Sequence, residues 1–159
     1  MTQPFGHLNA QGDARMVDVT AKDVTARTAT AEGLVSCPPP VVALLRDGAV
    51  PKGDVLAVAR VAGISAAKRT ADLLPLAHVI GLHGVEVDLV VVDEGVRIIS
   101  TVRAAERTGV EMEALTSVAV AALAVVDMVK GIDKSVAIRD IQLVSKSGGR
   151  SGEWRRSEA

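Results

Sequence analysis

The segment at residues 109–130 constrains the fold more than any other part of the chain. It contains the longest apolar run, VAVAALAVV at 118–126, and Gly131 follows its end. Apolar residues occupy almost every position around a helix built on this segment, so that helix has no wide polar face to turn toward water. Nine consecutive apolar residues are too few to cross a bilayer, which needs about 20. We therefore expect a buried helix with Gly131 at C′, and no membrane span.

Composition limits what can surround this helix. Hydrophobic residues make up 48% of the 159 residues, yet Phe5 and Trp154 are the only aromatic ones. The core must therefore be built from Val, Ala, Leu and Ile. The length predicts one domain with a substantial core, and the apolar content leads us to expect further burial between subunits.

Charge, cysteine and histidine content exclude several classes of function. The formal net charge is −1, which together with the scarcity of aromatic residues disfavours a nucleic-acid-binding protein. The single cysteine, Cys37, rules out an internal disulfide framework, a Cys-rich zinc site and an all-Cys iron–sulfur cluster. His7, His78 and His83 lack a metal-ligand spacing, so we expect no metal and no cofactor. The N-terminal residues have neither the basic start nor the apolar stretch of a secretory signal, which favours a cytoplasmic protein.

The hydrophobic patterns predict a flexible segment at 1–15 and a single α+β domain at 16–155. Extended segments and strands are predicted from period-two alternation; they lie at 16–20, 24–35, 84–92, 95–102 and 135–146. The third and fourth of these form a hairpin. The Gly/Ser-rich basic tail KSGGRSGEWRR is expected to be solvated and flexible.

Helices are predicted between the strands. A short helix follows Cys37 with proline in its first turn and Gly48 past its end. A longer one spans 55–74, with Asp54 as its N-cap and Gly63 at a close helix contact. The resulting order of strands and helices matches split β-α-β units, which predicts a ferredoxin-like fold with an antiparallel sheet packed with helices.

Two carboxylates stand at the start of the long apolar helix, in the sequence TGVEMEALT at 108–116. Thr108 and Glu111 have the spacing of a capping box, in which the glutamate reaches back to the helix N-terminus. We weigh that structural role of Glu111 equally against a ligand-binding role. Glu113 has no comparable structural explanation, because it points into the start of an almost wholly apolar helix.

The other end of the same helix carries Asp127 and Lys130, which can pair on one face. Glu113 and Asp127 lie within about 40° of each other around the axis but about 21 Å apart along it. Both ends can simply emerge into water on either side of a subunit. The alternative is that both line ligand sites, and then one site must be shared by two chains of a symmetric oligomer.

Other polar residues are weaker candidates. Lys52 precedes a helix N-terminus, where anions bind favourably, and Lys146 lies in the basic tail, which lacks the order of a P-loop. His78 follows a helix break, where a site role is plausible. Arg27 reads as an ordinary exposed strand residue.

Four stretches carry a resemblance to a known family: HLNAQGDARMVDVTAK, PKGDVLAVARVAGISAAKRTADLLPLAH, RTGVEMEALTSVAVAALAVVDMVK and KSGGRSGEW. In this order they are similar to the cyclic pyranopterin monophosphate synthase family, also called the molybdenum cofactor biosynthesis protein C family. The resemblance covers roughly residues 7–155. It implies a ferredoxin-like subunit in a homohexamer, a trimer of dimers, with active sites between subunits.

The resemblance also implies a reaction. The substrate would be 3′,8-cyclo-7,8-dihydroguanosine 5′-triphosphate, and a phosphorus–oxygen lyase would convert it to cyclic pyranopterin monophosphate and diphosphate. The alternative is a catalytically weak paralogue that binds the nucleotide or assembles with homologues. The positions that match the family's catalytic residues are Asp127, Lys52 and Lys130. The positions that match substrate-binding residues are Leu76, Ala77, His78, Met112, Glu113, Glu111, Lys146 and Arg27.

The sequence departs from the family pattern near these positions. Ala77 stands where the family usually has cysteine, and Val79 replaces a proline. Val126 replaces an aromatic residue before Asp127. Because Ala77 retains its main chain, we predict that substrate binding through backbone atoms survives and that the thiol is dispensable.

Overall fold

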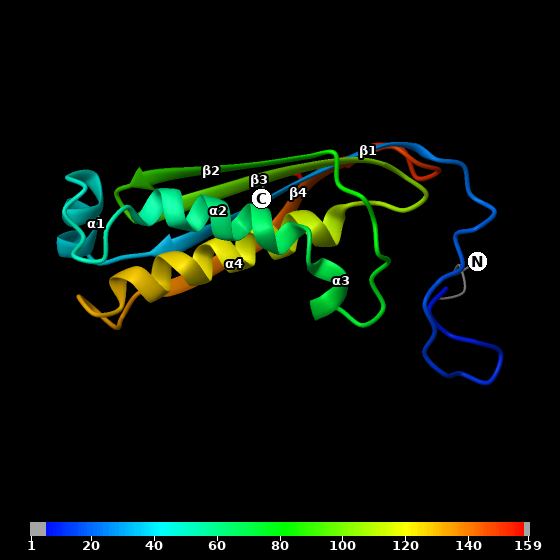
Figure 1. Ribbon diagram of the computed structural model, residues 1–159, viewed down its shortest axis with the longest axis horizontal. Coiled ribbons are helices and arrows are strands. Elements are labelled where there is room, and N and C mark those ends of the chain that lie inside the picture. Colours follow the sequence, from blue (N-terminus) through cyan, green and yellow to red (C-terminus); the bar gives the residue numbers. More distant parts are fainter. Residues whose placement is uncertain (1–5, 158–159) are drawn as a thin grey trace.

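The computed structural model describes residues 6–157 and consists of one antiparallel sheet with helices packed on one face (Figure 1). The sheet has five strands in the order β2-β3-β1-β4-β5. The strands are β1 (Thr25–Ser36), β2 (Gly84–Val92), β3 (Gly95–Glu106), β4 (Ala137–Ser147) and β5 (Trp154–Arg155). The helices are α1 (Pro39–Arg46), α2 (Val55–Ala67), α3 (Thr70–Leu73) and α4 (Glu111–Val129).

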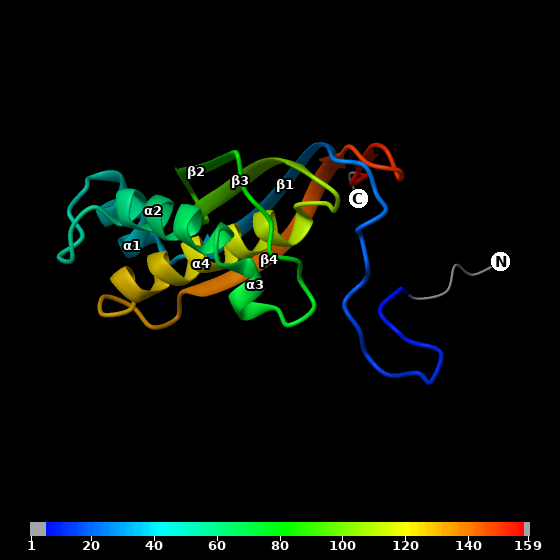
Figure 2. The same cartoon turned by 45° about the vertical axis from the view of Figure 1, so that its right-hand side comes forward.

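The connectivity is that of two interleaved split β-α-β units. β1 lies between β3 and β4 and pairs antiparallel with both, while β2 pairs with β3 at the sheet edge. The helices between β1 and β2 form one connection, and α4 between β3 and β4 forms the other. The predicted ferredoxin-like α+β fold is confirmed, and α2 and α4 lie side by side across the sheet (Figure 2).

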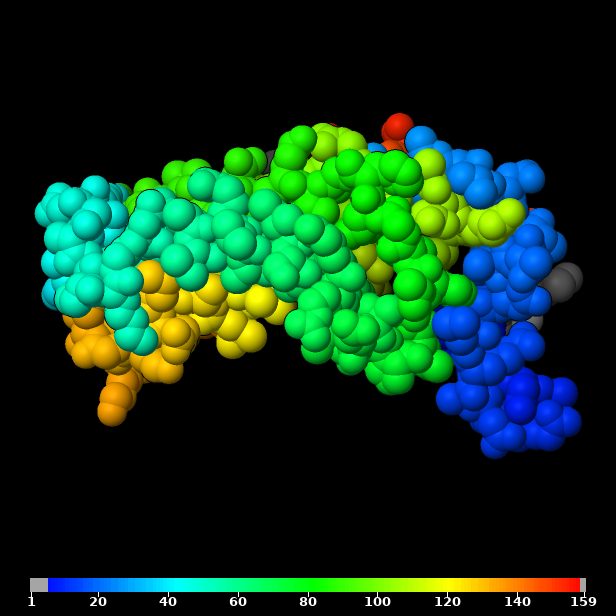
Figure 3. All heavy atoms as spheres, viewed as in Figure 1, coloured from blue at the N-terminus to red at the C-terminus, as the bar shows by residue number. Residues whose placement is uncertain are grey.

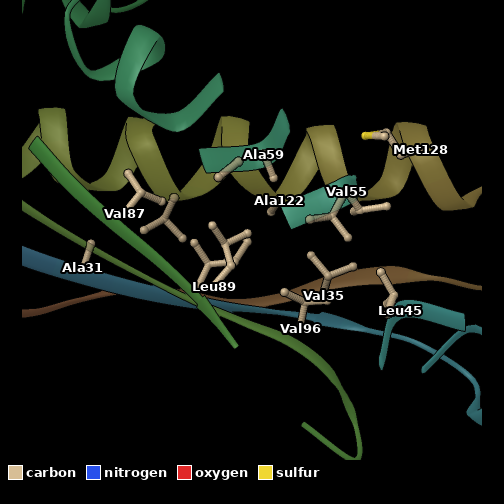
Figure 4. Close-up of a cluster of buried hydrophobic side chains, with 14 of the residues drawn as sticks. Ala31, Val35, Leu45, Val55, Ala59, Val87, Leu89, Val96, Ala122 and Met128 are labelled. Carbon is tan, nitrogen blue, oxygen red and sulfur yellow. The ribbon is translucent and has the colours of Figure 1, made fainter. Parts of the chain in front are cut away.

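The core between the sheet and the two long helices is aliphatic, as the composition required. Alternate residues of β1 and β3, such as Val35 and Val96, point toward the helices and are fully buried. They meet Val55 and Ala122 from α2 and α4 (Figure 4). Gly63 on α2 is buried, and a Cβ there would lie 3.0 Å from the Ser117 carbonyl oxygen of α4, so the predicted close helix contact is confirmed.

Among residues 6–157, α4 is the one helix whose length and mean hydropathy would allow it to cross a bilayer, but half of its apolar stretch is buried inside the fold. The helix packs against α2 on one side and against β1, β3 and β4 below. Its apolar character is therefore explained by its place at the centre of the domain.

One predicted helix is wrong. The helix predicted at 55–74 is broken at Lys68 and Arg69 into α2 and α3, because the buried Thr70 hydroxyl donates to the Ala67 carbonyl at 3.0 Å and tightens the chain there. The segment at 16–20, predicted only as extended, belongs to no strand. Its polar groups are used locally or by side chains from elsewhere, for example where the Asp18 carboxylate accepts from the Thr20 amide.

The Gly/Ser-rich tail is also more ordered than predicted. It turns back after β4, and Trp154 and Arg155 pair with Lys146 and Ser145. Gly148, Gly149 and Gly152 adopt positive φ in this turn, which is why three glycines are needed within five residues.

Candidate functional site

A cavity of about 380 Å³, with both polar and apolar side chains in its wall, opens where three segments meet: the N-terminal segment, the loop after α3 and the start of α4. We call it the apolar cavity because, unlike its neighbour, it contains Val17, Val19, Leu76 and Met112. Figure 3 shows the blue N-terminal segment lying against the green loop at this end of the molecule. The cavity is lined by His7, Val17, Val19, Lys22, Leu76, Ala77, His78, Thr108, Gly109, Glu111, Met112 and Glu113. Leu76 and Met112 are 38% and 44% exposed, so they offer open apolar surface to a bound molecule.

A cationic cavity of about 370 Å³ adjoins the first one and shares Lys22, Thr108, Gly109 and Glu111 with it. Its other residues come from β1, from the end of β3 and from the Gly-rich turn after β4. Five of its lining side chains are basic and one is acidic: Lys22, Arg27, Arg107, Lys146 and Arg150 surround Glu111. Such a surplus of positive charge in a recess suits a polyanion.

Glu113 is the most unusual group of the site. Its side chain belongs to the first turn of α4 and is only 4% exposed. Burial, with a smaller contribution from the neighbouring Glu111 carboxylate, raises the pKa of Glu113 from its ordinary 4.5 to about 7. At neutral pH this carboxyl therefore exists in both protonation states, as a general acid or base requires.

Glu111 does not form the predicted capping box. The N-cap of α4 is the buried Val110, and no side chain caps the helix. Glu111 is consequently the first helical residue (N1) and does not occupy N3, the position from which a capping-box glutamate reaches back to the N-cap. Its carboxylate lies against Gly109, where any side chain would overlap it, and it lines both cavities.

The loop after α3 positions His78 and Ala77. The His78 Nε2 donates to the Val17 carbonyl at 2.6 Å, which assigns the ring proton to Nε2. The Ala77 amide donates to the Leu74 carbonyl at 3.1 Å. Because that amide is used within the turn, the predicted main-chain contact from Ala77 to a substrate is restricted to its carbonyl.

The Gly-rich turn fixes the cationic cavity from the opposite side. Arg27 Nε donates to the Glu106 carbonyl at 3.1 Å, and the guanidinium lies directly over Gly149, where a side chain would overlap it. The Lys146 ammonium donates to the Ser151 hydroxyl across the turn. Arg27 is therefore only partly exposed and is held in the site, unlike the ordinary strand position that its sequence context suggested.

The remaining predicted residues form a separate cluster at the far end of α4. Asp127 pairs with Lys130 at 2.6 Å, and Lys52 donates to the Asp127 carbonyl at 2.8 Å. These two lysines, with Lys130 the stronger, hold the pKa of Asp127 below its usual range. All three side chains are at least half exposed.

Eight of the eleven predicted site residues thus gather at the N-terminal end of α4, and three lie at its C-terminal end. Sequence reasoning missed Lys22, Arg107 and Thr108 as site residues. Only the position of Arg107 beside the Thr108–Glu111 sequence hinted at its role. Within residues 6–157, no group of three or more His, Cys, Asp or Glu side chains is arranged to hold a metal ion.

Comparisons with known proteins agree on one family. The model of the MoaC family matches residues 16–149. A protein of Streptomyces coelicolor called cyclic pyranopterin monophosphate synthase is 60% identical over 151 residues, which cover 95% of this chain and 89% of the relative. A protein of the same name from a Nocardioides species is 58% identical, with 94% of each chain covered. Cyclic pyranopterin monophosphate synthase 2 of Mycobacterium tuberculosis is 53% identical over 96% of this chain and 91% of its own length.

Proposed function

This chain belongs to the MoaC family, and on that premise we propose that it is the lyase that forms cyclic pyranopterin monophosphate in molybdenum cofactor biosynthesis. The substrate is 3′,8-cyclo-7,8-dihydroguanosine 5′-triphosphate, and diphosphate is the second product. A substrate derived from GTP also supports the proposal that the protein is cytoplasmic. The weak-paralogue alternative is not favoured, because relatives at 53–60% identity carry the synthase name.

This proposal rests mainly on the two adjoining cavities, because one has the positive charge that a triphosphate needs and the other has the apolar walls that a ring system needs. The cationic cavity binds the triphosphate, which brings about four negative charges, through charge-assisted hydrogen bonds from Arg27 and Lys146. The same groups stabilise the charge that develops on the departing diphosphate.

The apolar cavity takes the guanine-derived ring system. Leu76 and Met112 supply the walls, and Glu113 and Glu111 supply acceptors for the ring's N–H donors. Glu113, with its pKa of about 7, is placed to take up or release a proton during the rearrangement of the purine ring.

Asp127, Lys52 and Lys130 enter the active site from a second copy of the chain. The rise of an α-helix separates Glu113 from Asp127 by about 21 Å, so one small substrate cannot contact both within one chain. In a symmetric dimer, however, the N-terminal end of one α4 can face the C-terminal end of another. Dimers of this kind would assemble as three pairs into the homohexamer.

Three measurements test the proposal. The first is conversion of the cyclised triphosphate by the purified chain, followed as diphosphate release and formation of the cyclic product. We expect both products in equal amounts, and no product above background would reject the function. The oligomeric mass, measured by light scattering, is expected to equal six chains.

The third measurement tests the shared site. Glu113→Gln and Asp127→Asn are each expected to be inactive alone. After the two are unfolded and refolded together, half of the random dimers are mixed, and each mixed dimer has one intact site. A shared site therefore predicts about a quarter of wild-type activity. No recovery, with mixed dimers detected by mass after one of the two variants has been labelled with ¹⁵N, would show that each chain contains a complete site.

A further inference from the structure

Residues 16–24 cross the two cavities without belonging to any helix or strand, and we call them the strap. Val17 and Val19 are half-buried and line the apolar cavity, while Asp18 and Thr20 alternate with them and face solvent. Lys22 lines both cavities. The strap thus forms one wall of the proposed substrate site, and it does so without hydrogen-bonded pairing to a neighbouring strand.

Two side chains from the folded domain hold this wall in place. His78 Nε2 donates to the Val17 carbonyl at 2.6 Å, and Arg107 Nε donates to the Lys22 carbonyl at 2.9 Å. Both contacts link residues far apart in sequence, and both end on backbone oxygens five residues apart. His78 comes from the loop after α3 and Arg107 from the end of β3, so the strap is fastened from two sides of the site.

We propose that His78 and Arg107 are positioning residues that fasten the strap across the active site, and that Lys22 reaches the substrate's phosphates only while the strap is fastened. This inference rests on the proposed function for the identity of the substrate, but the fastening itself does not. A segment with few backbone pairings opens locally at low cost, so these two hydrogen bonds set how often the site is closed. Because the Arg107 side chain also lines the cationic cavity, it both holds the strap and faces the bound polyanion.

Substitution of His78 or Arg107 by glutamine tests the hydrogen bond to the strap separately from the other properties of these side chains. Its Nε2 lies the same number of bonds from the backbone as the Nε2 of histidine and the Nε of arginine. Glutamine at 78 or 107 therefore keeps a donor for the strap but removes the imidazole or the positive charge. The matched variants without a donor are His78→Leu and Arg107→Met.

Limited digestion with trypsin reports strap opening without any substrate, because Arg15 lies just before the strap and Lys22 lies within it. Loss of one of these hydrogen bonds is expected to speed cleavage after Lys22 about fivefold to tenfold. We therefore expect fast cleavage in His78→Leu and Arg107→Met, and near-wild-type cleavage in His78→Gln and Arg107→Gln, in full chains whose melting temperatures match the wild type. Inorganic triphosphate is expected to slow cleavage of the wild type, and to slow it less in Arg107→Gln, which lacks the charge.

Turnover gives the second readout. Arg107→Met is expected to raise KM for the cyclised triphosphate more than it lowers kcat, with partial rescue of KM in Arg107→Gln. Equal cleavage rates in all four variants and the wild type would overturn the proposal, and so would glutamine variants that are cleaved as fast as the variants without a donor. If the cleavage pattern holds while the wild type forms no product, the strap is supported and the proposed function fails.

Discussion

The two ends of α4 carry the same kinds of residues in opposite surroundings. At its N-terminal end Glu113 is buried, and its pKa is raised by the loss of water. At its C-terminal end Asp127 is exposed, and its pKa is lowered by two lysines. The first end is enclosed by the chain's own strap, loop and Gly-rich turn. The second end has charged groups in place but faces solvent.

This contrast supports the proposal that a second chain completes the C-terminal end. Charges act strongly on a reacting substrate only where water is excluded. One chain provides such an enclosure around Glu113, and within residues 6–157 the Lys52, Asp127 and Lys130 side chains remain at least half exposed. A second copy that covers the exposed end would exclude water from it and would bring to it the substrate bound at the second copy's own N-terminal end of α4. The following predictions test this difference between the two ends.

Asp127→Asn is expected to have the largest effect, a loss of about 10²–10⁴ in kcat, because it removes a group that we propose acts in proton transfer. Its melting temperature should stay close to the wild type, since the side chain is exposed and its ion pairs are worth little to stability. Steady-state kinetics and thermal unfolding check both points. Asp88→Asn, an exposed aspartate on β2, is the control and should retain full activity. A wild-type kcat in Asp127→Asn would remove the C-terminal end from the active site.

Glu113 is expected to make stability depend on pH. Its folded-state pKa of about 7 exceeds the ordinary 4.5, so the folded state holds the proton more tightly than the unfolded state does. The contribution of Glu113 to the free energy of unfolding is therefore fully present below about pH 4.5 and is lost as the pH rises through about 7. The total loss is about 3 kcal/mol at most.

Glu113→Gln should abolish this fall, and urea unfolding between pH 5 and 8 measures it. The control is Glu86→Gln, an exposed glutamate on β2, which should leave the pH dependence unchanged. If Glu113→Gln shows the same pH dependence as the wild type, burial does not perturb this carboxyl.

Gly63→Ala tests the middle of α4, between its two ends. The new methyl group would lie 3.0 Å from the Ser117 carbonyl oxygen and 3.2 Å from the Ala121 Cβ, so the two helices must move apart. We expect a net loss of about 1–2 kcal/mol, because overpacking outweighs the gain in helix propensity. The exposed Ser65→Ala in the same helix should instead be neutral or stabilising. Chemical denaturation distinguishes the two, and a stabilised Gly63→Ala would show that the helix contact is looser than described.

Asp54→Ala is expected to have the smallest effect, about 1 kcal/mol. The Asp54 carboxylate accepts from the Ala57 amide at 2.9 Å and caps α2 just after the loop that carries Lys52. Asp54→Asn keeps an acceptor and should be nearly neutral. Thermal unfolding of the two variants makes the comparison, and equal losses in both would attribute the effect to charge rather than to the cap.

The sequence predicted the fold well because its strongest signals are local and repeated. Period-two alternation predicts the hairpin strands at 84–92 and 95–102. The Asp54 cap predicts the start of α2, and the long apolar run predicts α4. The order of these elements along the chain allows few topologies. The prediction failed at two helix boundaries, where local contacts override the pattern. Thr70 interrupts a helix that its neighbours favour, and Val110 begins α4 two residues later than the Thr108 capping pattern suggests.

The site was predictable only in part. Residues with family counterparts were identified by resemblance, and the structure groups eight of them. Lys22 and Arg107 were missed because their contact runs from a side chain to a backbone carbonyl 85 positions away, which leaves no trace in residue types. The cationic cavity likewise depends on sheet order, since pairing of β1 with β3 and β4 is what brings positions 27, 107 and 146 together.

The unbroken course of α4 from Glu111 to Val129 has a consequence for how this chain can change over time. A rigid helix couples angle to length: each inserted or deleted residue turns everything beyond it by about 100° and moves it by about 1.5 Å. A single deletion near Ala121 would swing Asp127 away from the direction it shares with Glu113. Substitutions along the helix can therefore accumulate, whereas changes in its length would put one end out of phase with the other.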